Sequence, residues 1–84
     1  MMSLDRIRLA RKRFIGTNQT TKAIAQGLAQ MVYVARDADV RVVQPIVELA
    51  QQMGVAVEWV ESMGALGKAC GIEVGAATAA ILED

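Results

Sequence analysis

The amino-acid sequence predicts an α/β protein in which a central sheet is covered by helices on both faces. Two short apolar segments, 31–35 and 55–60, have the composition of buried strands, and segments of helical periodicity alternate with them. The 84 residues are 54% hydrophobic, which suits one packed domain over residues 1–84. Because only three residues are aromatic, the core must consist mainly of aliphatic side chains.

The first part of the chain is predicted to contain two helices. Residues 4–14 divide into an apolar and a basic stripe, as in an amphipathic helix, and Gly16 ends this helix. A second helix follows, with Thr17 or Asn18 as its N-cap, and Gly27 stops it. The alternation leaves room for a short strand between the two helices.

The middle of the chain is predicted to continue with strand and helix. Residues 31–35 form a strand buried on both faces, and the polar residues 36–39 form the turn after it. A third helix runs from about Pro45, which fits best in a first turn, and stops at Gly54. Residues 40–44 are expected to be an irregular or 3₁₀ lead-in.

The last part of the chain keeps the same alternation. Residues 55–60 form a second strand, and Ser62 caps a short helix that extends to Ala69. The run 76–82 is rich in alanine, which favours helix. We nevertheless assign it to a strand, because the run is short and the surrounding order alternates strands with helices.

Composition excludes several kinds of site. Cys70 is the single cysteine and histidine is absent, so one chain can form neither a disulfide nor a Cys/His zinc site. No nucleophile–base pair or phosphate-binding glycine loop stands out, so we expect no enzyme, no metal and no cofactor. Asp37 and Asp39 are interpreted as solvated turn acids. No apolar run approaches the ~18–20 residues of a spanning helix, and no signal-peptide core is apparent, which predicts a cytoplasmic protein without a membrane partner.

The net charge is zero, but the charges are unevenly distributed. Residues 1–22 carry six cations and one acid, a formal charge of +5, and residues 23–84 carry the compensating −5. Five of the cations lie within residues 6–13, directly before the Gly16 segment. Such a run is usually a solvated face, but its position here favours an anion-binding surface.

The segment 16–22, Gly-Thr-Asn-Gln-Thr-Thr-Lys, is the most informative of the chain. Gly16 permits close backbone approach and precedes a helix N-terminus, with its free N–H groups and partial positive charge. Asn18 and Gln19 carry amides that can pair with base edges, and Lys22 follows one turn later on the same face. This combination suits a polyanion with exposed bases. The alternative is an ordinary turn glycine, helix caps and a solvated lysine.

Three segments resemble the L-seven-Ae family of kink-turn-binding ribosomal proteins. Residues 16–22 are similar to the family's Gly-x-Asn-Glu-x-x-Lys signature, and Val-Tyr-Val-Ala-Arg-Asp at 32–37 to its second strand and acidic turn. Residues 60–71 are similar to its Val-x-Ser-x-x-x-Leu-Gly-x-Ala-x-Gly segment. The three segments follow the family's order and spacing across residues 4–83.

The resemblance implies a fold and a partner. The fold is a three-layer α/β/α sandwich with a mixed four-stranded sheet. The partner is ribosomal RNA, the ribosome or regulatory RNA with a kink-turn, a sharply bent motif with sheared G·A pairs and a flipped-out nucleotide. A kinked motif lets amides reach base edges that the narrow deep groove of regular A-form RNA hides. The short length, Gln19 and the triplet 61–63 look most like the small bacterial, YbxF-type branch, and we expect a monomer.

The resemblance also implies roles for the loop that follows the strand 55–60. Val60 and Met63 would form an apolar seat for the unstacked base, with backbone groups reading its edge; the alternative is a turn with Val60 in the core. Glu61 would repel phosphate, and Gln19 replaces the usual glutamate with a mixed donor and acceptor. Gln19 predicts a weaker contact with a guanine amine, and Glu61 predicts lower affinity or binding that depends more on magnesium. The predicted RNA-binding residues are Gly16, Thr17, Asn18, Gln19, Lys22, Arg36, Val60, Glu61, Ser62, Met63 and Lys68.

Other residues are given simpler roles. Arg36 and Arg41 could touch the rim of the RNA, and Lys68 could reach phosphate. Tyr33 and Trp59 are expected to pack within their strands rather than to stack on bases. The alternative function is a protein-interaction module that keeps this fold without binding RNA. The RNA-binding hypothesis requires that the turn before the second helix, at Gly16, and the loop after the strand 55–60 lie close together.

Overall fold

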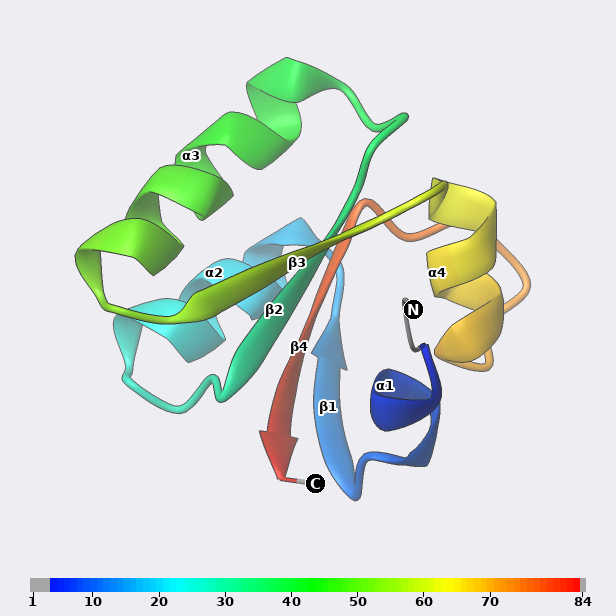
Figure 1. Ribbon diagram of the computed structural model, residues 1–84, viewed down its shortest axis with the longest axis horizontal. Helices are drawn as coiled ribbons and strands as arrows, with labels where there is room; N and C mark the ends of the chain where they lie inside the picture. Colours follow the sequence, from blue (N-terminus) through cyan, green and yellow to red (C-terminus); the bar gives the residue numbers. More distant parts are fainter. Residues whose placement is uncertain (1–3, 84) are drawn as a thin grey trace.

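The computed structural model describes residues 4–83. Helices and strands alternate along the described residues in the predicted order, and the short first strand is present (Figure 1). The strands are β1 (Lys12–Ile15), β2 (Met31–Ala35), β3 (Ala56–Val60) and β4 (Thr78–Glu83). The helices are α1 (Asp5–Leu9), α2 (Thr17–Ala25), α3 (Val40–Gln52) and α4 (Met63–Ala69).

The four strands form one mixed sheet in the order β1-β4-β2-β3. β4 runs antiparallel to both of its neighbours, whereas β2 and β3 are parallel. The central strands β2 and β4 are almost entirely buried, which explains their continuous apolar sequences. The prediction that the alanine-rich run forms a strand is confirmed, because it pairs along both edges.

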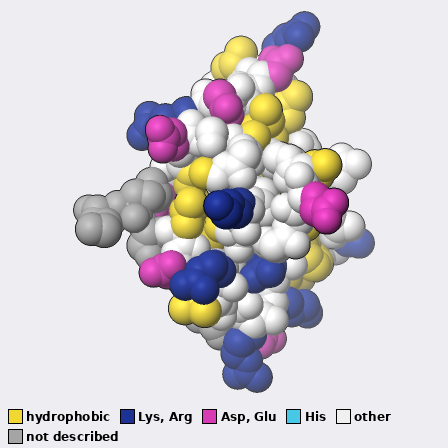
Figure 2. Space-filling model, turned by 90° about the vertical axis from the view of Figure 1, so that its right-hand side faces the viewer, with side chains coloured by type: hydrophobic (Ala, Val, Ile, Leu, Met, Phe, Trp, Pro, Cys, Tyr) yellow, Lys and Arg dark blue, Asp and Glu magenta, His cyan; other side chains and the backbone are white. Residues whose placement is uncertain are grey.

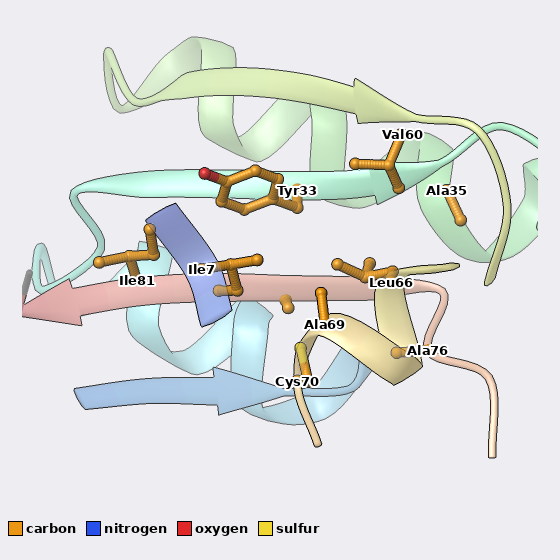
Figure 3. Packing of buried hydrophobic residues seen from close by; sticks show 10 residues of the cluster. Ile7, Tyr33, Ala35, Val60, Leu66, Ala69, Cys70, Ala76 and Ile81 are labelled. Carbon is orange, nitrogen blue, oxygen red and sulfur yellow. The ribbon is translucent and has the colours of Figure 1, made fainter. Parts of the chain in front are cut away.

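Helices cover both faces of the sheet, which confirms the three-layer sandwich (Figure 1). On one face, Ile7 of α1 and Leu66 of α4 pack over Tyr33 of β2 (Figure 3). On the other face, α2 and α3 pack over a second cluster that includes Val34 and Ile46. Tyr33 and Val34 belong to different clusters because successive side chains of a strand point to opposite faces.

The N-terminal segment differs from its prediction. A single helix is expected over residues 4–14, but α1 ends at Leu9, Ala10 is extended, and β1 begins at Lys12. The apolar spacing does fit a helix. However, residues 12–15 form a ladder with β4 that a longer helix would lose. Tertiary pairing therefore overrides the local periodicity.

Helix α3 begins five residues earlier than predicted. The Asp39 carboxylate accepts a hydrogen bond from the backbone N–H of Arg41 at 2.9 Å, and this N-cap starts the helix at Val40. Pro45 consequently lies inside the helix, which loses the one bond that its missing N–H would donate. The Arg41 guanidinium also binds the Asp39 carboxylate at 2.8 Å, and these hydrogen bonds lower the pKa of Asp39.

Expectations for three notable side chains have different outcomes. Tyr33 is fully buried, as predicted. Cys70 is also buried, as predicted, and burial raises the pKa of its thiol although the nearby Arg13 charge acts in the opposite direction. Trp59 is 37% exposed, so its predicted packing is incomplete, because β3 is an edge strand. In the part of the chain that the structure describes, no helix is long and apolar enough to cross a membrane.

Arg13 joins the first strand to the ends of two helices. Its guanidinium donates hydrogen bonds to the carbonyls of Ile7 and Arg8, both at 3.0 Å, and to the Cys70 carbonyl at 2.9 Å. These carbonyls belong to the C-terminal ends of α1 and α4, where unpaired carbonyls and the helix dipole favour a cation. One member of the basic run is therefore an internal structural group.

We expect Arg13→Lys to lower the free energy of unfolding by about 1–2 kcal/mol. A lysine keeps the charge, but its compact ammonium lacks the planar fork that reaches both helix ends at once. Denaturant titration measures the change, with Arg11→Lys at an exposed position as the matched control. Equal stability of the two variants would contradict this structural role.

Candidate nucleic-acid interface

Four segments meet at one end of the sheet, the upper end in Figure 1. β1, β2 and β3 end there and β4 begins there, since Val34 pairs with Thr78 and Ala35 pairs with Val60. We call this end the loop edge; it comprises the start of α2, the β2–α3 turn, the β3–α4 loop and the α4–β4 loop. Gly16 follows β1 and Val60 is the last residue of β3, which lies three strand positions away, so roughly 14 Å separates them. The two segments that the RNA-binding hypothesis requires to converge lie at this same edge.

Backbone hydrogen bonds hold the loop edge together. Three of them join neighbouring strand ends, each at 2.9 Å: Gly16 N–H donates to the Thr78 carbonyl, Ala35 N–H to the Ala77 carbonyl and Arg36 N–H to the Val60 carbonyl. A fourth joins the α4–β4 loop to α4, from Ala76 N–H to the Met63 carbonyl at 3.0 Å. Each bond joins segments that are distant in the sequence. The loop edge is therefore fixed by the sheet beneath it, which favours a preorganised interface.

The start of α2 leaves its polar groups available. Gly16 is the N-cap, with a φ of +97° that residues with a side chain rarely adopt, and no side chain caps the helix. The prediction that Thr17 or Asn18 is the N-cap is therefore wrong, because both lie in the first helical turn. The N–H groups of Thr17, Asn18 and Gln19 point out of the helix end. Asn18, Gln19 and Lys22 are exposed, so two amides and a cation face solvent together.

The neighbouring loops hold Met63 by both of its backbone polar groups. Its N–H donates a hydrogen bond to the Asp37 carboxylate at 2.8 Å, and its carbonyl accepts from Ala76 at 3.0 Å. Ser62 caps α4 as predicted, because its Oγ accepts a hydrogen bond from the Ala65 N–H at 3.0 Å. Asp37 is an exposed turn acid, as predicted, and its carboxylate in addition braces the β3–α4 loop.

Asp37→Ala is expected to destabilise the β3–α4 loop locally, by about 1 kcal/mol, because the Met63 N–H loses its acceptor. Amide hydrogen exchange at Met63 measures this, and the exchange should be several-fold faster in the variant. Asp37→Asn keeps an acceptor oxygen and should retain most of the protection. Unchanged exchange in Asp37→Ala would show that the brace contributes nothing.

The remaining predicted residues are divided between core and surface. Val60 is 1% exposed and packs with the cluster beneath α1 and α4, so its side chain cannot seat a base and the core alternative is correct. Met63 is half-buried, whereas Glu61 and Arg36 are exposed at the loop edge. Lys68 is exposed in the last turn of α4, away from the loop edge.

Sequence reasoning missed the α4–β4 loop. Through Ala76 it is bonded to Met63, and it leads directly into β4 beside Gly16, so it lies in the middle of the loop edge. Val74 in this loop is 71% exposed and adds an apolar contact to the candidate interface. The sequence signal that could have pointed to this loop is Val74, an isolated valine next to Gly75 in a turn-like segment.

The charges of the loop edge do not include the basic run. Lys12 pairs with Glu83 at one end of β1 and Ile15 pairs with Ala79 at the other, so the strand separates the basic run from Gly16 by roughly 13 Å. The basic run and the Gly16 segment, which are adjacent in the sequence, therefore lie toward different ends of β1, and the expectation that the run forms an anion-binding surface stays a prediction. The loop edge therefore offers a few placed polar groups rather than a strong positive field.

These features define a small α/β/α binding domain with an open interface, and the described residues enclose no pocket. The chain belongs to the Ribosomal protein L7Ae/L30e/S12e/Gadd45 family, whose family model matches residues 3–84. The resemblance inferred from the sequence is thereby confirmed.

Individual relatives match over nearly their whole length. The chain is 47% identical over 81 residues to an RNA-binding protein of Bacillus pumilus (strain SAFR-032) and 46% identical over 81 residues to the RNA-binding protein YbxF of Geobacillus stearothermophilus. Each alignment covers 96% of this chain and 99% of the relative. Among solved structures, the Giardia lamblia 15.5kD RNA binding protein superposes with a TM-score of 0.87 and 28% identity, covering 96% of this chain and 71% of that chain.

Proposed function

We propose that this protein is a non-catalytic RNA-binding protein that recognises kink-turns, in ribosomal or regulatory RNA, through the loop edge. The observation that carries the proposal is the N-terminus of α2, where no side chain caps the helix. Exposed Asn18, Gln19 and Lys22 lie there, at the same edge as the β3–α4 loop. The names of the relatives and of the Giardia lamblia structure support RNA as the ligand.

Base recognition depends on the start of α2. The Asn18 and Gln19 amides offer donors and acceptors to the edges of the sheared G·A pairs, and Lys22 donates to a guanine carbonyl or a phosphate. The three free N–H groups of the first helical turn add a site for a phosphate oxygen. Gly16 allows the RNA backbone to approach without meeting a side chain.

The flipped-out nucleotide would contact the other half of the loop edge. Met63, with its backbone held by Asp37 and Ala76, and exposed Val74 offer apolar contact to an unstacked base. Arg36 would contact a phosphate at the rim, whereas Glu61 would repel one. The edge therefore binds RNA with specificity from α2 and modest electrostatic attraction, as a monomer in the cytoplasm.

Binding to two matched RNAs tests the proposal. One is a kink-turn, and the other is the same duplex with its G·A pairs replaced by Watson–Crick pairs. We expect at least tenfold tighter binding to the kink-turn, measured by fluorescence anisotropy in magnesium. Equal affinity for both RNAs would overturn kink-turn recognition. Absence of RNA binding even at low salt would favour the protein-interaction alternative.

A further inference from the structure

The exposed members of the basic run form a second charged surface, which we call the basic end. It consists of Arg6, Arg8, Arg11 and Lys12, all of them exposed. They lie on α1 and at the start of β1, and Figure 2 shows dark-blue side chains gathered in the lower half of this face. Lys12 lies at the end of β1 opposite to the loop edge, and α1 packs over the sheet face that carries Tyr33.

The basic end is held on a rigid support. α1 is anchored by the fully buried Ile7, and the Arg13 guanidinium ties its last carbonyls to the end of α4. The exposed cations are therefore displayed on a fixed surface rather than on a flexible tail. Such a display reduces the entropy that is lost when the side chains bind a ligand.

The described acids beside the basic end offset only part of its formal charge. Asp5 pairs with Arg8 at 3.0 Å, yet the Arg8 side chain remains 56% exposed. Glu83 lies opposite Lys12 in the sheet register. Among the described residues, the four cations and the two acids Asp5 and Glu83 carry a formal charge of +2, whereas residues 23–84 are acidic overall. The positive charge is concentrated on this surface although the whole chain is neutral.

We propose that the basic end binds the phosphate backbone of a second RNA segment outside the kink-turn. Three of its four cations are arginines, whose planar guanidinium matches phosphate geometry. None of its four side chains is an amide of the kind that pairs with base edges, so its contacts would not read sequence. Because the length of β1 separates Lys12 from Gly16 by roughly 13 Å, one protein could hold two RNA segments, one on each surface. The inference rests on the proposed function only for the choice of RNA as the ligand.

The test compares two RNA probes and three protein variants. The probes are a kink-turn with minimal arms and a regular RNA duplex without a kink-turn. Arg11→Gln/Lys12→Gln removes two charges from the basic end, and Arg11→Lys/Lys12→Arg is the matched control that keeps both. Asn18→Ala alters the loop edge alone. All exchanged positions are exposed, so folding should be preserved, and circular dichroism verifies it.

Wild-type protein should bind the regular duplex weakly at low salt. The glutamine variant should lose at least fivefold of this affinity and show a shallower salt dependence, since fewer counterions are released. The charge-keeping control and Asn18→Ala should bind the duplex as wild type does. For the minimal kink-turn the pattern reverses: Asn18→Ala weakens binding and the glutamine variant does not.

Two results would overturn the inference. One is that the glutamine variant binds the duplex as tightly as wild type, or that Asn18→Ala weakens duplex binding as much as the glutamine variant does. The other is binding of the basic end to phosphatidylserine vesicles without duplex binding, which would assign it to a membrane surface with the exposed Leu9. Failure of the proposed function has a different signature, because the kink-turn would then bind no better than the duplex.

Discussion

Asn18→Ala and Lys22→Ala are each expected to weaken binding to a kink-turn by about 1–3 kcal/mol, which is roughly a 5- to 150-fold rise in Kd. Both side chains are exposed in the first turns of α2, a helix whose start no described side chain caps. Removing the amide or the ammonium leaves a base edge or phosphate desolvated without its partner. Anisotropy titration against the kink-turn and its Watson–Crick counterpart measures the loss, which should be confined to the kink-turn.

The fold should tolerate both substitutions, because alanine has a higher helix propensity than asparagine and is at least equal to lysine. A drop in affinity therefore reports on the interface rather than on unfolding. Gln51→Ala is the matched control for the amide, since Gln51 is exposed near the far end of α3. If Asn18→Ala and Lys22→Ala bind as Gln51→Ala does, the start of α2 does not contact the RNA.

Gly67→Ala is expected to lower the free energy of unfolding by about 3 kcal/mol. Gly67 lies in α4, and an added Cβ would overlap the backbone carbonyl of Val74, which cannot rotate away as a flexible side chain could. The α4–β4 loop would have to shift from the loop edge. Thermal and denaturant unfolding measure the stability, and kink-turn affinity should fall as well.

The same helix provides a control for this substitution. A Cβ on Gly64 would meet only the Ser62 Oγ, at 3.9 Å, which is ordinary contact. Gly64→Ala should therefore leave stability unchanged or raise it by up to about 1 kcal/mol through helix propensity. If Gly67→Ala were as stable as Gly64→Ala, the α4–β4 loop would be shown to shift at no cost in stability.

Much of the fold could be predicted because burial patterns are local. The apolar run 31–35 and the capped helix after Ser62 appear in the structure at nearly their expected positions. The two large errors have non-local or competing causes. Residues 12–15 follow a helical spacing, but their strand pairs with β4, and Pro45 concealed an earlier helix start that Asp39 caps.

The candidate interface could be predicted in its parts but not in its assembly. The residues of the 16–22 segment are recognisable by type and spacing. Contacts between distant positions are not: the Asp37 carboxylate binds the backbone 26 residues further on, and Arg13 reaches a carbonyl 57 residues away. For the same reason, the sequence does not show that β1 places the exposed cations of the basic run and the Gly16 segment toward different ends of one strand.

The central position of β4 has a consequence for the nascent chain. Of the described strands, β4 is synthesised last. It nevertheless lies between β1 and β2, which are not adjacent in the sheet. While the ribosome still covers residues 78–83, only the β2–β3 pair can form, and β1 has no strand to join. The sheet can therefore close only after translation of the final strand, and such long-range pairing is expected to slow folding.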